Sequence, residues 1–99
     1  MPLYRTARFD VRPDSVDPAL AALRELTENA RGTEPGTQLF LSLQDKVHPN
    51  RFSQFMIFDD EAAAERYRTA ESTKKYYAAL QPYIVGGIQF RDSHAIASS

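Results

Sequence analysis

Hydrophobic and polar residues alternate along residues 3–12, which predicts a β-strand with one buried face. Arg5 is the only charged residue on that face. The residues that we expect to be buried are Leu3, Ala7, Phe9 and Val11. Pro13, Asp14 and Ser15 follow directly and end the strand.

The same alternation recurs in a predicted hairpin, residues 37–47 and 51–58, whose turn lies at residues 48–50. A second turn, Glu34-Pro35-Gly36, opens the hairpin. Because neither face of the hairpin is wholly polar, we expect both sides of the sheet to be covered. The protein's own helices would cover one face, and a second subunit the other. The predicted subunit face carries Leu39, Leu41, Leu43, Phe55 and Ile57, and the predicted helix face carries Phe40, Ser42, Gln54, Met56 and Phe58.

Three segments follow the spacing of amphipathic helices. The first covers residues 16–31, with Ser15 as its expected N-cap and Gly32 as its expected C-cap. The second covers residues 61–70, after an N-cap at Asp59 or Asp60. The third follows an N-cap at Ser72 and ends near Pro82. The apolar stripes are Leu20, Leu23, Leu26 and Ala30; then Ala63, Ala64, Tyr67 and Ala70; then Tyr76, Ala79, Leu80 and Tyr83.

A last strand is expected at residues 88–95, with Gly86 and Gly87 as a bend that enters it. The element order is then β-α-β-β-α(α)-β, which predicts an α+β fold of the ferredoxin-like βαββαβ type, an antiparallel sheet with helices on one face. The length of 99 residues predicts one domain, residues 1–99, with a frayed tail at residues 96–99. The uncovered sheet face predicts a homodimer with two-fold symmetry.

Charge and composition exclude several classes of function. Twelve basic and 13 acidic residues give no net attraction toward nucleic acid or an anionic membrane. The chain has no cysteine, which excludes disulfides and thiolate chemistry and fits the cytoplasm, where we expect the protein to be. No apolar run approaches the ~20 residues that span a bilayer, and no signal peptide is expected. His48 and His94 have no neighbours with ligand spacing, so we expect no metal site.

Four short sequences, taken in order, give the chain a family likeness. They are Val11-Arg12-Pro13, Glu34-Pro35-Gly36, Pro49-Asn50-Arg51-Phe52 and Phe58-Asp59-Asp60-Glu61-Ala62. With them the chain resembles the antibiotic biosynthesis monooxygenase family, which includes quinol-monooxygenase-like proteins. The likeness covers nearly the whole chain and implies a dimeric α+β barrel, formed when the sheets of two subunits pack face to face.

The resemblance also implies functional positions, and this chain departs from three of them. Members of the family commonly have Trp where this chain has Phe58, Glu where it has Met56, and His where it has Tyr67. The absence of Trp and His at Phe58 and Tyr67 disfavours the haem-degrading branch. Other members oxidise phenols or quinols with O₂ and neither flavin nor metal, which implies that no cofactor is needed here.

The helix face of the hairpin is the candidate substrate site. A pocket wall there would stack on a planar ring, and the alternative is a packed core with a satisfied amide. A buried Tyr hydroxyl could bind a phenolate or relay a proton, and the alternative is a Tyr that fills a helix–sheet interface. We expect Tyr67 and Gln54 to be catalytic, Tyr67 because it occupies the family's His position. The expected substrate-binding residues are Phe40, Ser42, Met56, Phe58 and Tyr76.

The sequence contains no nucleophile elbow, phosphate-binding loop, zinc spacing or dinucleotide fingerprint. An enzyme of this kind relies on a substrate that supplies its own electrons, such as a hydroquinone or an anthrone-like phenol, whose anion reduces O₂. The leading hypothesis is therefore a cofactor-independent monooxygenase that acts on a small aromatic or quinol-like substrate. The alternatives are a non-catalytic dimeric ligand-binding or accessory protein, and an isomerase or cyclase that needs no O₂.

Overall fold

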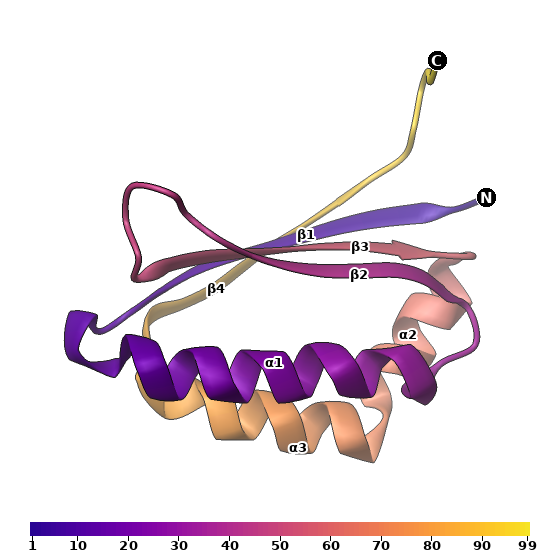
Figure 1. The fold of residues 1–99 in the computed structure, drawn as a ribbon. Helices are drawn as coiled ribbons and strands as arrows, with labels where there is room; N and C mark the ends of the chain where they lie inside the picture. Colours follow the sequence, from indigo (N-terminus) through magenta and orange to yellow (C-terminus); the bar gives the residue numbers. More distant parts are fainter.

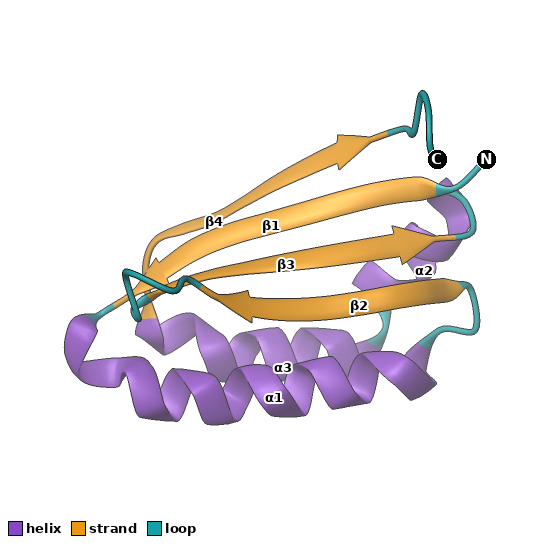
Figure 2. Ribbon diagram, turned by 45° about the horizontal axis from the view of Figure 1, so that its top comes forward, coloured by secondary structure: helices purple, strands orange, loops and turns teal.

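The protein is a four-stranded antiparallel sheet with three helices on one of its sides. The computed structural model describes residues 1–99, except for the side chain of Arg31. The strands are β1 (Leu3–Val11), β2 (Thr37–Gln44), β3 (Arg51–Phe58) and β4 (Ile84–Ser93). They lie in the order β2-β3-β1-β4, and each neighbouring pair is antiparallel (Figure 2). The predicted ferredoxin-like α+β fold is confirmed.

The helices are α1 (Val16–Thr33), α2 (Glu61–Thr69) and α3 (Glu71–Leu80). Short 3₁₀ turns, η1 (Pro13–Ser15) and η2 (Gln81–Tyr83), precede α1 and follow α3. Helices α1 and α3 run side by side beneath the sheet, and α2 lies at one end of it (Figure 1). No helix in the described part of the chain is long and apolar enough to cross a membrane.

The side chains between sheet and helices form two buried clusters. The α1 cluster contains Phe9, Val11, Ala19, Leu23, Leu26, Phe52 and Leu80. The α2 cluster contains Leu3, Ala7, Ala30, Met56, Phe58, Ala63, Ala64 and Tyr67. The alternation of β1 and β3 thus buries one face of each strand, as predicted.

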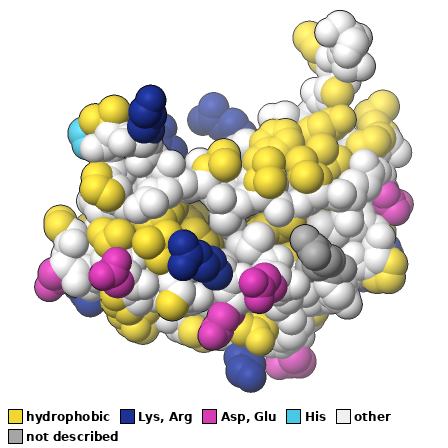
Figure 3. All heavy atoms as spheres, in the orientation of Figure 1, with side chains coloured by type: hydrophobic (Ala, Val, Ile, Leu, Met, Phe, Trp, Pro, Cys, Tyr) yellow, Lys and Arg dark blue, Asp and Glu magenta, His cyan; other side chains and the backbone are white. Residues whose placement is uncertain are grey.

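The opposite face of the sheet, called here the outer face, carries the other half of the alternating pattern. In the register, Leu41 lies opposite Phe55, and Ile57 lies opposite both Leu39 and Tyr4. Leu41 and Leu43 remain 44% and 49% exposed. Figure 3 shows hydrophobic side chains gathered on the sheet side of the molecule, away from the helices. The predicted division of the hairpin into two faces is confirmed.

Strand β2 is shorter than predicted, since it ends at Gln44 and not at Val47. The carboxylate of Asp45 accepts hydrogen bonds from the amides of Val47 and His48, at 2.9 and 2.7 Å. This Asx turn takes the backbone out of the sheet.

Helix α1 is longer than predicted, because Gly32 lies inside it and Glu34 is the C-cap. A residue before proline disfavours the helical conformation, and Glu34 adopts an extended one in front of Pro35. Proline therefore ends the helix where glycine was expected to. At the other end, Ser15 occupies the N-cap position without a capping hydrogen bond, since its hydroxyl pairs with Asp14.

Of the N-caps predicted for α2 and α3, one is confirmed and one is wrong. Asp60 caps α2 as predicted, because its carboxylate accepts from the Ala63 amide at 2.8 Å. Ser72 does not cap α3, which begins one residue earlier after an N-cap at Ala70.

Strand β4 begins at Ile84, four residues before the predicted start, and ends at Ser93. Gly86 and Gly87 have φ angles of 77° and 81° inside the strand, where the pairing with β1 shifts between Arg8 and Asp10. The two glycines therefore form a β-bulge and do not mark the start of the strand.

Candidate functional site

A pocket on the helix side of the sheet lies against β4. Its volume is about 540 Å³, within the usual range of small-molecule sites. Strands β1, β3 and β4 form one wall, and α2 and α3 form the other. The apolar surface comes mainly from Met56, Tyr67, Tyr77, Ile88 and Phe90.

Phe90 shows how open this pocket is. It lies opposite Ala7 on the inner face of the sheet, yet its side chain is 56% exposed. A large apolar side chain on the inner face of a strand is normally covered by a helix, and here it borders an empty hollow. The hollow can therefore accept an aromatic ring against Phe90 without unfolding any element.

Buried polar groups line the inner part of the pocket. The hydroxyls of Tyr67 and Thr73 are buried near each other, and neither has a described partner at normal hydrogen-bond distance and geometry. The hydroxyl of Tyr77 donates to Oε1 of Gln54 at 3.0 Å, while Nε2 of the same amide has no described partner. Since nearly all buried polar groups in proteins are hydrogen-bonded, these unpaired groups mark a place for a ligand or for ordered water.

Burial also sets the protonation of the two tyrosines. Loss of solvent raises the pKa of Tyr67 well above its ordinary range, and the nearby Tyr77 adds to the effect. Burial likewise raises the pKa of Tyr77 to about 12, although its bond to Gln54 acts in the opposite direction. Both phenols therefore keep their protons near neutral pH and act as hydrogen-bond donors, not as bases.

The charged group inside the pocket is Arg5. Its Nε and Nη2 donate to the two carboxylate oxygens of Asp92, at 2.7 and 3.1 Å, across the β1–β4 pairing. This bond raises the pKa of Arg5 and lowers the pKa of Asp92. The guanidinium also lies 5.7 Å from the centre of the Phe58 ring, within cation–π range. Arg68 and Lys74 also line the pocket, and they are paired with Glu65 and Glu71.

The structure brings together five of the seven predicted site residues. Met56 and Tyr67 line the pocket. Phe40 and Phe58 pack against the Tyr67 ring, with centroids 5.6 and 5.7 Å away. Gln54 lies behind Tyr77 and is connected to the site by its hydrogen bond with the Tyr77 hydroxyl.

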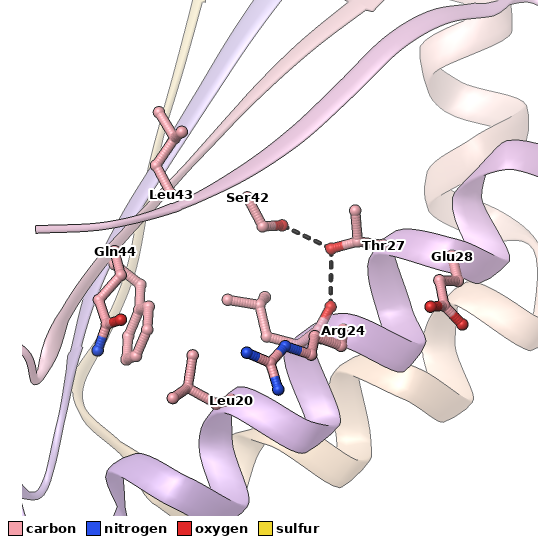
Figure 4. Close-up of a pocket in the computed structure, with 9 residues that line it drawn as sticks. Leu20, Arg24, Thr27, Glu28, Ser42, Leu43 and Gln44 are labelled. Atoms are coloured by element: carbon pink, nitrogen blue, oxygen red, sulfur yellow. Dashed lines mark hydrogen bonds between the residues drawn. The ribbon is translucent and has the colours of Figure 1, made fainter.

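The other two predicted residues lie elsewhere. Tyr76 packs against the α1 cluster, and its neighbour Tyr77 lines the pocket instead. Ser42 borders a second hollow of about 390 Å³ between α1 and β2. There it points toward Thr27 at 2.6 Å, and Thr27 in turn donates to the Leu23 carbonyl (Figure 4). Because Thr27 has used its only proton, Ser42 is the donor in that pair.

Four residues of the pocket were not among the predicted site residues: Arg5, Thr73, Tyr77 and Asp92. Arg5 was visible as the one charge on an otherwise apolar face, but only the fold shows that Asp92 lies beside it. Tyr77 and Thr73 were missed because the buried stripe of α3 is rotated relative to the predicted one, so that Thr73 is buried and Ala79 is exposed.

The sequence profile of the family described as antibiotic biosynthesis monooxygenase matches residues 2–79. The chain belongs to this family. Met56, Phe58 and Tyr67, the three positions at which the resemblance implied other residues, all lie in the α2 cluster beside the pocket.

Solved structures share this fold over nearly their whole length. One, an antibiotic biosynthesis monooxygenase, is 21% identical with a TM-score of 0.89, and the match covers 96% of this chain and 99% of that one. A protein from Mycobacterium tuberculosis is 17% identical with a TM-score of 0.89, and the match covers 100% of this chain and 99% of that one. A protein from Pseudomonas aeruginosa is 21% identical with a TM-score of 0.86, and the match covers 97% of this chain and 95% of that one. Comparison with curated proteins gave no match. At these identities the structural likeness establishes the fold.

Proposed function

We propose that this protein is a monooxygenase that acts on a small aromatic or quinol-like substrate with O₂ and without a cofactor. The observation that carries the proposal is the pocket itself, in which apolar walls surround the buried, unpaired hydroxyls of Tyr67 and Thr73. Membership of the antibiotic biosynthesis monooxygenase family supports the same reaction class.

The reaction balances without an added reductant. In an anthrone-like substrate, the two C–H bonds of one ring carbon break, one oxygen atom of O₂ becomes the new carbonyl oxygen, and the other leaves as water. All the electrons that reduce O₂ come from the substrate. The protein then has to orient the ring, stabilise its anion and limit the access of water.

The described residues fit these tasks. Phe90 and Ile88 offer a surface on which a ring can lie, beside Met56. The hydroxyl of Tyr67, which keeps its proton, can donate to the oxyanion that develops on the ring. Gln54 fixes the hydroxyl of Tyr77 and so determines the direction in which that hydroxyl points.

Oxygen consumption tests this proposal directly. Purified protein, treated with a chelator, is given a panel of hydroquinones and anthrone-like phenols in an oxygen-electrode cell. We expect uptake with at least one of them, and we expect Tyr67→Phe and Gln54→Leu to lower the rate by about tenfold or more, as for the loss of one donor to an oxyanion. Tyr83→Phe is the control, because Tyr83 packs against the α1 cluster.

Two results would contradict the proposal. Unchanged rates in both site variants would show that the site is assigned wrongly. Stabilisation of the protein against heat by the same phenols, with no oxygen uptake from any of them, would instead fit a non-catalytic ligand-binding protein.

We also propose that two copies pair through the outer face of the sheet to form a dimeric α+β barrel. The apolar side chains of that face, Leu41 and Leu43 among them, are half exposed in the single chain. Light scattering should give the mass of a dimer, and Leu41→Arg should give that of a monomer. Ala21→Arg, on the exposed side of α1, is the control and should remain dimeric. A monomeric wild-type protein at micromolar concentration would contradict the pairing.

A further inference from the structure

The polar groups of the pocket include hydrogen-bond donors that lack a partner. Its charged lining residues are Arg5, Arg68, Lys74 and Asp92, and Arg68 and Lys74 are paired with Glu65 and Glu71. The buried hydroxyls of Tyr67 and Thr73 make no hydrogen bond to a described residue at normal distance and geometry. A ligand with acceptor oxygens would complete this site, and an anionic oxygen would form the stronger bond with the guanidinium of Arg5.

Arg5 is the cation best placed to meet such a ligand. Its side chain is only 18% exposed, whereas that of Arg68 is 62% exposed and bonds Glu65 on its own helix. A guanidinium has five N–H donors, and Asp92 takes two of those of Arg5. The remaining three have no described partner. Asp92 thus holds the group rigidly while leaving donors for something else.

The position of Arg5 in the sheet directs these donors toward the proposed substrate. Arg5 lies opposite Met56 on β3 and Asp92 on β4, both of which also line the pocket. Its guanidinium lies against the ring of Phe58, which in turn packs on Tyr67. A partly buried Arg in this setting is weakly hydrated and has a fork of donors that matches an anionic oxygen.

The same residues offer no free base. Tyr67 and Tyr77 keep their protons, and the carboxylate of Asp92 is occupied by Arg5. A substrate that must react as its anion is therefore best bound after it has already ionised. The site then stabilises that charge and does not create it.

We propose that this pocket selects aromatic anions, with Arg5 as the residue that binds the anionic oxygen, either an ionised ring hydroxyl or a carboxylate on the ring. The inference concerns the same pocket as the proposed function and names the class of its substrate. It requires binding only, so that it can be tested where no oxidation takes place.

The test uses three nitrobenzenes that share one ring and lack a hydroquinone. They are 4-nitrophenolate, 4-nitrobenzoate and the neutral ether 4-nitroanisole, each titrated into the full-length protein by calorimetry at a pH where 4-nitrophenol is ionised. We expect at least one of the two anions to bind about tenfold or more tightly than the ether, as for a charge-assisted hydrogen bond. Binding of 4-nitrophenolate would identify an ionised ring hydroxyl as the group that Arg5 binds, and binding of 4-nitrobenzoate would identify a carboxylate. Added salt should weaken the binding of the anion and leave the binding of the ether unchanged.

Arg5→Met should abolish the preference for the anion. Arg24→Met is the matched control, because it removes the same charge from the second hollow, and it should leave the preference intact. Circular dichroism checks that both variants fold. If Arg5→Met does not fold, Arg5→Lys replaces it, and there the preference should fall without vanishing because an ammonium lacks the fork of donors.

Three results would overturn the inference. These are no binding of either anion, equal affinity of the anions and the ether for the wild-type protein, and a preference that survives Arg5→Met or is lost in Arg24→Met. None of these results depends on O₂. A protein that binds the anions but never consumes oxygen would leave this inference standing and remove the proposed function.

Discussion

The two core clusters lie between the same sheet and the same set of helices, but they are completed in different ways. The buried residues of the α1 cluster are all apolar, with Phe9 stacked on Phe52 at 5.7 Å, and its members Leu23 and Phe52 also border the second hollow. The α2 cluster ends in Tyr67, whose hydroxyl has no partner in the described part of the protein, and it borders the pocket that contains Arg5.

This difference separates stability from function within one small core. A cluster of apolar side chains buries no unpaired polar group that a ligand could satisfy, so its residues contribute mainly to folding. A cluster that buries an unpaired hydroxyl loses some folding stability, and a binding site is a common reason for such an arrangement. The comparison therefore predicts opposite effects of mutations at the two ends.

The largest expected effect is in the α1 cluster. Phe52 is 1% exposed, and Phe52→Ala should destabilise the protein by about 3–5 kcal/mol, because it leaves a cavity beside Phe9. Urea unfolding followed by circular dichroism measures this. Phe90→Ala removes the same ring from the edge of the pocket and should cost less than about 1 kcal/mol, since Phe90 is half exposed. Similar losses in both variants would show that the two regions do not differ in packing.

A second effect concerns the contact that holds α2 over the sheet. A Cβ atom added at Gly36 would lie 2.6 Å from the Cβ of Ala63, and neither atom can move without its backbone. Gly36→Ala should therefore displace α2, destabilise the protein by about 1–3 kcal/mol and weaken ligand binding beside Tyr67.

Gly32→Ala is the matched control for this change. Gly32 lies inside α1 and has open space around its Cα, so that alanine should stabilise the helix by about 0.5–1 kcal/mol. If Gly36→Ala were equally stabilising, the close approach of α2 to the hairpin would be wrong.

Much of this architecture could be predicted from the sequence because it depends on local patterns. The alternation in β1, β2 and β3 determined which residues face the helices, and Asp60 was visible as a cap. The errors occurred where a residue distant in sequence, or a competing turn, decides the outcome. Pro35 ends α1 beyond Gly32, Asp45 ends β2 early, and the glycines of β4 are explained only by its pairing with β1.

The candidate site was less predictable for the same reason. Tyr67, Met56 and Gln54 lie on elements whose buried faces the pattern shows. The pairing of Arg5 with Asp92 joins residues 87 positions apart and follows from strand order alone. Ser42 was assigned to the correct face of its strand, but the face is wide enough to border two separate hollows.

A smaller effect compares two tyrosines at the pocket. Tyr67→Phe removes an unpaired buried hydroxyl and should leave stability unchanged or raise it by up to about 1 kcal/mol. Tyr77→Phe removes the donor to Gln54, leaves Oε1 of that amide unpaired and should cost about 1–2 kcal/mol. Urea unfolding of both variants decides the matter. A clear loss of stability in Tyr67→Phe would show that its hydroxyl is bonded in the unliganded protein.

The most specific effect is the titration of Tyr77. Burial raises its pKa from 10.0 to about 12, so the native protein holds this proton at pH values where the unfolded chain has released it. The stability that this contributes is fully present below pH 10 and is lost as pH rises toward 12. The difference in tyrosinate absorbance between wild type and Tyr77→Phe should therefore develop near pH 12. The unfolding free energy of the wild type should fall more steeply than that of the variant across the same interval. A titration of Tyr77 near pH 10 would mean that water reaches its hydroxyl freely. The inner end of the pocket would then be as wet as an ordinary surface, and burial would not explain the protonation of Tyr77.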